Sequence, residues 1–306
     1  MKRQFSILLH LLILLALSAC GIVPASKSPM PSPTATPMPT GMVDVGGYEL
    51  YYECSGQGSP TVILESGGTG DSSDWAAVMD GLEGTTRVCA YDRASLGRSD
   101  PVPGPRIFEE MTRDLQVLLE KAHIGGPYIL AGWSMGGMLV RIFADQHPGE
   151  VAGVVLLDSA HPDMGLRLLA CLPPELAGEP ENIQHLRQYF IWMSDSNEPP
   201  SITIDENVDI RPSMQQARAV STLGDLPLVV ISQGPNVPGL GLDWGPLPTE
   251  IEVCLQQTWQ DMQGELVELS SNATRLTARG GHMFPVEEPE LVIQAIVELA
   301  NEIRSR

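Results

Sequence analysis

This sequence lacks an excess of basic residues, recognisable metal motifs and long apolar runs. Its 18 Lys and Arg residues stand against 38 Asp and Glu residues, a formal charge of −20 at pH 7, and no basic patch is visible. We therefore expect no nucleic-acid partner. The sequence contains no H-E-x-x-H motif and no Cys/His cluster at ligand spacing, so we expect no metal site. The apolar run from Phe5 to Leu17 is too short to cross a bilayer comfortably as a permanent helix.

The first twenty residues have the order of an export signal. Lys2 and Arg3 precede the apolar run, and Leu17-Ser18-Ala19-Cys20 follows it. That ending resembles the bacterial lipobox, which implies lipid attachment to the Cys20 sulfur, cleavage before it and acylation of the new amino terminus. An ordinary secretory signal with an incidental Cys20 is the alternative. We expect a lipoprotein signal peptide at residues 1–19 and a protein anchored by lipid to the bacterial membrane, facing outside the cytoplasm.

A tether and one folded domain are expected to follow the signal. Residues 24–40 are almost all Pro, Ser, Thr, Ala and Met, a composition that cannot build a packed core. We interpret residues 20–41 as an extended tether and residues 42–306 as the domain. Four cysteines remain after Cys20, and outside the cytoplasm they permit two disulfides in any of three pairings.

The folded part alternates apolar strands with amphipathic helices, which predicts an α/β fold with a mainly parallel sheet. Between about residues 159 and 225 the alternation stops, and an insertion of this length at the mouth of a sheet is often a lid. Strands are expected at 42–45, 48–53, 61–65, 87–91, 128–131, 151–158, 228–232 and 273–278, helices at 73–81, 108–122, 136–147 and 289–304, and lid helices at 182–193 and 211–223.

The stretch Gly132-Trp133-Ser134-Met135-Gly136 lies between an expected strand and an expected helix. This is the context that a G-x-S-x-G nucleophile elbow requires. The flanking glycines suit a turn that leaves no room for a Cβ atom, and the turn pushes the serine hydroxyl out above the sheet. We expect Ser134 to be a nucleophile, with a loop serine of no catalytic role as the alternative.

Four further stretches accompany the elbow, and with them the chain resembles the α/β-hydrolase superfamily from about residue 42 to its end. The resemblance implies an eight-stranded, mainly parallel sheet flanked by helices, with a small, mostly helical lid. The stretches are residues 62–70, Tyr91-Asp92-Arg93 with Gly97-Arg98-Ser99, residues 154–158 ending in Asp158, and Gly280-Gly281-His282.

The resemblance also implies an oxyanion hole and a general base. Where the family usually has His-Gly before the donor residue, this chain has Ser66-Gly67-Gly68, so the main-chain donors are Gly68 and Met135. A main-chain donor survives the replacement of histidine by Ser66, although the path of the loop stays open. His282 follows the last expected strand, as the family's catalytic histidine does, and must reach the serine hydroxyl.

The acid of the triad has two candidates. In most family members it follows the seventh strand, but here no carboxylate follows that strand until Asp243. Other members carry it at the end of the sixth strand, where Asp158 stands. We favour Asp158, with Asp243 as the second candidate and a helix-capping Asp158 as the alternative role. Asp92 and Arg93 match a motif that is usually structural, and we expect no catalytic role for them.

The resemblance suggests cysteine pairs as well. In this family the second and fourth strands are neighbours, which favours a bridge between Cys54 and Cys89. Cys171 in the lid and Cys254 in the loop expected after the seventh strand would form a second bridge. Buried reduced thiols are the alternative for each pair.

Together these residues predict a serine hydrolase that cleaves carboxylic esters of a small-molecule acyl substrate through an acyl-enzyme, without a cofactor. A serine nucleophile separates the chain from dehalogenases and epoxide hydrolases on the same fold, which use a carboxylate. One alternative is aminopeptidase-like amide hydrolysis, with Glu175, Glu179 or Glu181 binding an amine, and another is a non-catalytic surface binding module. The acyl group, the alcohol and the oligomeric state stay open.

Overall fold

The computed structural model describes residues 40–195, 206–235 and 244–306. Every described residue belongs to one compact unit, Met38–Arg306. The predicted signal peptide, Cys20, the tether as far as residue 39, and Asp243 lie outside the described residues.

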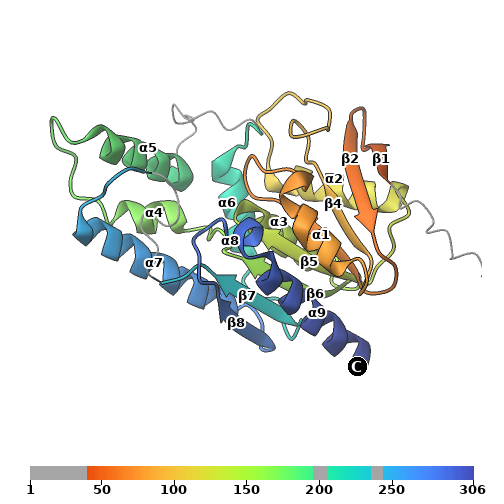
Figure 1. Ribbon diagram of the computed structural model, residues 1–306. Helices are drawn as coiled ribbons and strands as arrows, with labels where there is room; N and C mark the ends of the chain where they lie inside the picture. The colour runs from red at the N-terminus through yellow and green to blue at the C-terminus, as the bar shows by residue number, and fades with distance from the viewer. Residues whose placement is uncertain (1–39, 196–205, 236–243) are drawn as a thin grey trace, which may run out of the picture. The chain divides into compact units, whose positions relative to one another are not determined.

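Eight strands form one sheet in the order β1-β2-β4-β3-β5-β6-β7-β8 (Figure 1). The pairs β1–β2 and β2–β4 are antiparallel, and the remaining pairs are parallel. The predicted mainly parallel, eight-stranded sheet is therefore confirmed. The strands are β1 Thr40–Asp44, β2 Glu49–Ser55, β3 Thr61–Glu65, β4 Val88–Tyr91, β5 Tyr128–Trp133, β6 Val151–Leu157, β7 Leu228–Ser232 and β8 Ala273–Thr277.

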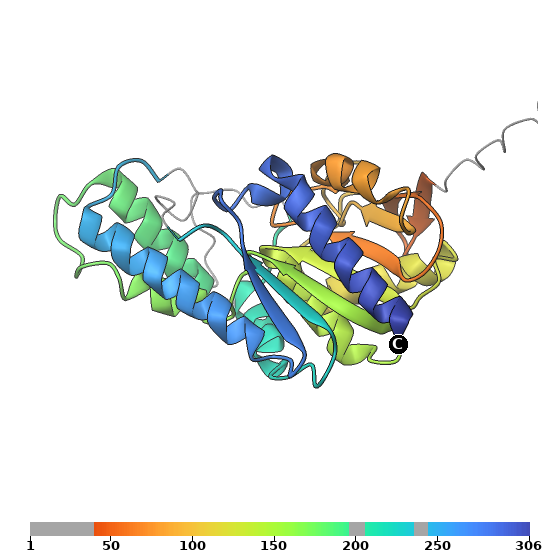
Figure 2. The same cartoon turned by 60° about the horizontal axis from the view of Figure 1, so that its bottom comes forward.

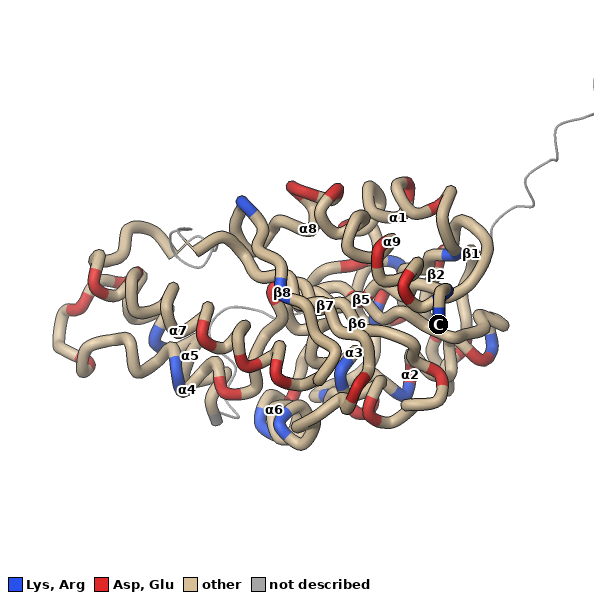
Figure 3. The backbone as a smooth tube through the Cα atoms, turned by 90° about the horizontal axis from the view of Figure 1, so that it is seen from below, with Lys and Arg blue, Asp and Glu red and all other residues tan. Residues whose placement is uncertain are grey.

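Helices cover both faces of the sheet, which is why its central strands β3 and β5 are buried along their whole length and are mostly apolar. Alternate residues point to opposite faces: Ile63 and Leu130 pack with helices α2 (Phe108–Lys121) and α3 (Met135–Gln146). Val62 and Ile129 pack on the other face, with α1 (Ala76–Leu82) and α9 (Pro289–Ser305). Figure 2 shows α9 lying along its face of the sheet, and Figure 3 shows acidic residues spread over the helices of both faces.

Three helices occupy the described parts of the chain between β6 and β7, and we call them the cap helices. They are α4 Met164–Leu169, α5 Glu181–Asp195 and α6 Ile210–Ala219. Their apolar residues join a third cluster with the side of α3 that faces away from the sheet, including Met138, Leu139 and Ile142. Of the three cap helices, α6 packs directly against α3, and α5 packs against α4 and α6.

The largest departure from the sequence-based prediction is α7, Thr249–Val267, which follows β7. We expected a loop there, and the placement of Cys254 in a loop was wrong. Ile251, Leu255, Trp259 and Met262 are buried at helical spacing, but polar residues interleave them and dilute the pattern. The short helix α4 was also not predicted, and α6 ends four residues before the predicted end at 223.

Two disulfides tie the fold together. Cys54 and Cys89 are direct partners on β2 and β4 and form one bridge. Cys171, just after α4, forms the other with Cys254 on α7. Both suggested pairs are present. In the described part of the chain, no helix combines the length and apolar character needed to cross a membrane.

Candidate active site

Ser134 stands at the sharp turn between β5 and α3. Its φ angle is 53°, a left-handed conformation that costs energy for a residue with a side chain. A Cβ atom on Gly132 would lie 2.5 Å from the Gly136 carbonyl oxygen, and one on Gly136 would lie 2.5 Å from the carbonyl oxygens of Glu65 and Ser66. Neither position has room for a side chain, as the elbow pattern predicted.

Main-chain hydrogen bonds hold this turn. The Ser134 N–H donates to the Leu157 carbonyl at 3.0 Å, and the Ser134 carbonyl accepts from Ala160 at 2.9 Å. Because both partners lie at or just beyond the end of β6, the turn is fixed to the strand that precedes Asp158.

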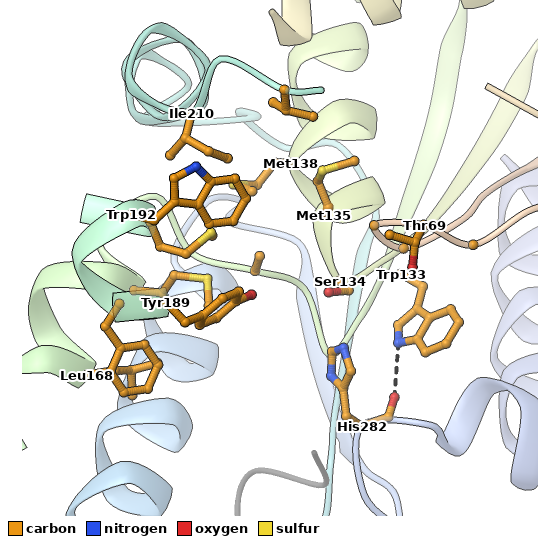
Figure 4. A pocket seen from close by; sticks show the side chains of 18 of the residues that line it. Thr69, Trp133, Ser134, Met135, Met138, Leu168, Tyr189, Trp192, Ile210 and His282 are labelled. Carbon is orange, nitrogen blue, oxygen red and sulfur yellow. Dashed lines mark hydrogen bonds between the residues drawn. The ribbon is translucent and has the colours of Figure 1, made fainter. Parts of the chain in front are cut away.

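Asp158 and His282 meet beside Ser134 although 124 residues separate them. His282 Nδ1 lies 2.6 Å from Asp158 Oδ2, and the Asp158 carboxylate is fully buried. Figure 4 shows the His282 ring next to the Ser134 side chain. The structure therefore brings Ser134, Asp158 and His282 together, whereas Asp243 lies outside the described residues.

The second oxygen of Asp158 is also occupied. Oδ1 accepts from the Gln233 main-chain N–H and from the Trp259 indole N–H, each at 2.9 Å. These two bonds fix the carboxylate while Oδ2 faces the imidazole. Trp259 was not foreseen, because it lies on the unpredicted helix α7 and no sequence motif marks it.

The loop that carries His282 has its own supports. The Trp133 indole N–H donates to the His282 carbonyl at 3.0 Å. Glu288 accepts hydrogen bonds from the N–H groups of Gly280 and Arg279. Burial raises the pKa of the Glu288 carboxyl, but these bonds outweigh it and the net pKa is lowered. The loop is thus tied both to β5 and to the start of α9.

The two predicted main-chain donors lie at the same place. Gly68 and Met135 line one pocket with Ser134, and a Cβ atom on Gly68 would be 3.9 Å from the Met135 sulfur. Among the described residues, neither N–H donates to a protein acceptor. Both are free to bind an oxygen held at Ser134, and the Met135 N–H opens helix α3.

A buried arginine holds the loop that contains Gly68. Arg93 donates all five of its N–H groups: to the carbonyls of Ser66 and Gly67 at 2.7 and 2.6 Å, to Glu65 at 2.6 Å, and twice to Glu206. Residues before position 93 supply three of these acceptors, and Glu206 comes from the chain just before α6. The expected structural role of Arg93 is thus extended to the loop after β3.

Glu206 links this loop to the segment that leads into the cap helix α6. Besides pairing with Arg93, it accepts the Thr69 N–H at 3.2 Å, and its side chain is fully buried. Burial raises the pKa of Glu65, which opposes Arg93 from the other side and also accepts from the Tyr91 hydroxyl. No motif in the sequence marks Glu206, because its partners are more than 100 residues away.

One pocket of about 570 Å³ opens between Ser134 and the cap helices (Figure 4). Its described lining contains no Lys or Arg, and Asp74 is the one carboxylate in it. Burial raises the pKa of Asp74. The walls are mostly aromatic residues and methionines: Trp133, Trp192, Trp244, Trp259, Tyr189, Phe190, Met135, Met138, Met164, Met193, Met214 and Met283.

The carboxylates proposed to bind an amine do not line this pocket. Glu175, Glu179 and Glu181 are absent from its described lining. Glu179 is instead paired with Arg187 at 3.0 and 2.9 Å, and the Glu181 side chain is 87% exposed. Over the described ranges 40–195, 206–235 and 244–306, no group of three or more His, Cys, Asp or Glu side chains could hold a metal ion.

The family model for the alpha/beta hydrolase fold matches residues 60–191. This stretch contains the elbow, the Arg93 loop and β6, and the sheet continues the fold to the end of the chain. The chain has the α/β-hydrolase fold.

Curated relatives of this chain carry several different names. It is similar to the probable transporter efuK of Hormonema carpetanum, 36% identical over 42% of this chain but only 20% of that protein. It is 23% identical to the uncharacterized protein YqjL of Bacillus subtilis over 80% of this chain and 85% of that one. It is 32% identical to the putative carbamate hydrolase RutD of Azorhizobium caulinodans over 37% of this chain and 42% of that protein.

Solved structures of similar fold also differ in activity. A thermophilic esterase from Thermogutta terrifontis is 22% identical with a TM-score of 0.57, over 87% of this chain and 98% of that one. A haloalkane dehalogenase variant, DbeA-M1 from Bradyrhizobium elkanii, is 14% identical with a TM-score of 0.64, over 88% and 98%. Since one fold hosts both reactions, the function must be argued from the site.

Proposed function

We propose that this protein is a serine hydrolase that cleaves carboxylic esters through an acyl-enzyme intermediate. The observation that carries the proposal is the 2.6 Å contact between His282 Nδ1 and the buried Asp158, beside a serine held in a glycine-flanked turn. These are the base, the orienting carboxylate and the nucleophile of a hydrolytic triad.

Acylation begins when the Ser134 oxygen attacks the ester carbonyl and His282 Nε2 takes the serine proton. Asp158 stabilises the imidazolium and keeps the ring in its working tautomer. The Gly68 and Met135 N–H groups bind the oxyanion of the tetrahedral intermediate. As the C–O bond to the alcohol breaks, His282 returns the proton to the leaving oxygen, and the acyl group stays on Ser134.

Deacylation repeats these steps with water as the nucleophile. His282 takes a proton from water as its oxygen attacks the acyl carbonyl, and the same two N–H groups bind the new oxyanion. The bond to the Ser134 oxygen then breaks, and His282 returns the proton to that oxygen. The acid product leaves and the enzyme is restored.

The nucleophile and the lining of the pocket favour an ester over the alternatives. A hydroxyl attacking a carbonyl gives an acyl-enzyme, whereas dehalogenation on this fold uses a carboxylate. Amine-terminal substrates receive little support, since the three glutamates considered for amine binding are absent from the described lining of the pocket. The names of the esterase and of the putative carbamate hydrolase fit acyl transfer to water.

The cap helices are the proposed lid. Leu168 of α4, Tyr189 and Trp192 of α5, and Ile210 of α6 line the pocket opposite Ser134 (Figure 4). A substrate bound there would be shielded from bulk water, which strengthens the electrostatic interactions of the site.

Export and lipid anchoring through Cys20 remain our proposal for the location of the enzyme. The two disulfides support it, because such bonds persist in oxidising compartments. Metabolic labelling with palmitate is expected for the wild-type protein in its bacterial host and should disappear in Cys20→Ser. Persistent labelling of that variant would exclude Cys20 as the lipid site.

Hydrolysis of p-nitrophenyl butyrate tests the activity itself. Ser134→Ala should lower kcat by at least about 10³-fold, since the nucleophile acts as a unit with its base. Ser271→Ala, which changes an exposed serine, is the matched control and should keep wild-type activity. A wild-type protein inactive on every activated ester would instead favour the binding-module alternative.

A further inference from the structure

Some indole N–H groups of the pocket donate a hydrogen bond within the protein, and one buried indole N–H group does not. Trp133 and Trp259 donate theirs within the protein, to the His282 carbonyl and to Asp158. Trp244 lines the same pocket, and its Nε1 atom is buried without a hydrogen-bond partner among the residues that the structure describes. Buried tryptophan N–H groups usually find a partner, so Trp244 stands out among these three.

Tyr189 is a second unpaired group beside it. The rings of Tyr189 and Trp244 have centroids 5.4 Å apart, and no hydrogen bond joins the Tyr189 hydroxyl to any residue that the structure describes. Burial raises the pKa of Tyr189 to about 12, so the hydroxyl keeps its proton at neutral pH and can donate it. Figure 4 shows the hydroxyl at the end of the ring that faces Ser134 across the open pocket.

Apolar neighbours cannot satisfy these donors. Phe190, Met193 and Leu168 line the same end of the pocket, and none of them carries a strong acceptor. A buried donor without a partner costs about 1–3 kcal/mol. The buried Trp244 donor and the adjacent unpaired Tyr189 hydroxyl belong to two side chains that line the cavity with Ser134, and both are best explained by an acceptor that arrives with the ligand.

We infer that Tyr189 and Trp244 form a subsite for an uncharged oxygen acceptor of the substrate. An indole N–H only donates, and a protonated phenol donates readily, so the bound atom is an acceptor such as a ketone, amide or second ester carbonyl. This inference rests on the proposed function and deepens it. The substrate class is an ester of a largely apolar acid that carries a second, neutral carbonyl beyond the reacting one.

The charges around the pocket decide against a carboxylate at this subsite. No Lys or Arg lines the described part of the pocket, whereas Asp74 does, and Asp158 lies behind His282. A substrate carboxylate would leave water for a site with no counter-charge and with negative groups nearby. A volume of about 570 Å³ accommodates a drug-sized molecule, so an acyl chain of eight carbons with one extra oxygen fits.

The test compares p-nitrophenyl octanoate with its 5-, 6- and 7-oxo derivatives, using the full chain. The measured quantity is the ratio of kcat/KM for the best oxo ester to kcat/KM for the plain ester. The oxo ester and the plain ester differ in water solubility, but this difference is the same for the wild type and for each variant. A change in the ratio between wild type and variant therefore measures the contribution of the subsite. Tyr189→Phe and Trp244→Phe should each lower it about tenfold, within a range of about 5- to 150-fold.

Met193→Leu is the matched control. It replaces another side chain of the pocket wall by one of similar volume, and it removes no hydrogen-bond donor. Its ratio should stay within about twofold of wild type. The mono-p-nitrophenyl ester of octanedioic acid tests the charge and should be a poorer substrate than the oxo esters. Preference for that acid, or an unchanged ratio in Tyr189→Phe and Trp244→Phe, would overturn the inference while leaving the esterase proposal intact.

A binding measurement separates the two proposals. Calorimetry with the Ser134→Ala protein should show tighter binding of the methyl ester of the preferred oxo acid than of methyl octanoate, and Tyr189→Phe in the same background should remove the difference. If the wild type hydrolyses no ester but this preference persists, the proposed function fails and the subsite stands. If the preference is absent here, the subsite is refuted whatever the activity.

Discussion

Arg93 offers the sharpest quantitative prediction. Its guanidinium donates five hydrogen bonds, to Glu65, Glu206 and the carbonyls of Ser66 and Gly67, and the side chain is 3% exposed. Lysine keeps the positive charge but has only three donors at one point. Arg93→Lys therefore leaves at least two of these bonds unmade in a buried place. At about 1–3 kcal/mol for each unsatisfied group, the free energy of unfolding should fall by about 2–6 kcal/mol.

The same substitution should slow catalysis, because the two carbonyls belong to the loop that presents Gly68. A displacement of about 1 Å in a reacting group can cost about 10²-fold, so we expect kcat to fall about 10- to 100-fold with a smaller change in KM. Urea unfolding measures the free energy of unfolding. The hydrolysis of p-nitrophenyl butyrate, followed under conditions well below the unfolding transition, gives kcat. Arg98→Lys, at a half-exposed arginine of the same motif, is the control and should change stability by less than about 1 kcal/mol. Near wild-type stability and kcat in Arg93→Lys would refute the reasoning.

Three further predictions concern the acid, the cap and pH. Asp158→Asn should lower kcat by about 10⁴-fold on an activated ester with unchanged circular dichroism, and Asp243→Asn should stay near wild type; the reverse result would move the acid to the chain after β7. Replacing Cys171 and Cys254 by Ser opens a bridge across 83 residues and should cost about 2–4 kcal/mol in urea unfolding, and a loss below about 1 kcal/mol would show that the bridge contributes little. Burial lowers the pKa of His161 to about 4, so the folded state binds its proton more weakly than the unfolded state, and stability should fall by at most about 3 kcal/mol as the pH drops from about 6.5 to 4. His161→Asn should flatten that part of the stability curve, and an identical slope would contradict this assignment.

Much of the fold follows from local patterns that need no tertiary information. The strands β3, β5 and β6 are mostly apolar runs, and their bounds lie within two residues of those predicted. Ser134 is predicted because the steric demand of its turn selects glycines on both sides, and His282 because the Gly-Gly-His stretch after the last strand resembles the α/β-hydrolase pattern. These features are visible in the sequence since each depends on neighbours in the chain.

The residues that sequence analysis missed depend on distant partners. Trp259 reaches Asp158 only because α7 packs beside β7, and polar residues masked that helix. Glu206 is one acidic residue among 38 until the fold places it against Arg93. Tyr189 and Trp244 are separated by 55 positions, so nothing local shows that their rings share one pocket wall.

The central claim is that Ser134 is the nucleophile activated by His282. The most direct measurement is peptide mass spectrometry of the purified full chain after reaction with a fluorophosphonate, which reacts covalently with an activated serine. We predict a single phosphonylated peptide with the modification on Ser134, and loss of that adduct in both Ser134→Ala and His282→Ala. An adduct on another serine, or labelling that persists in Ser134→Ala, would contradict the assignment.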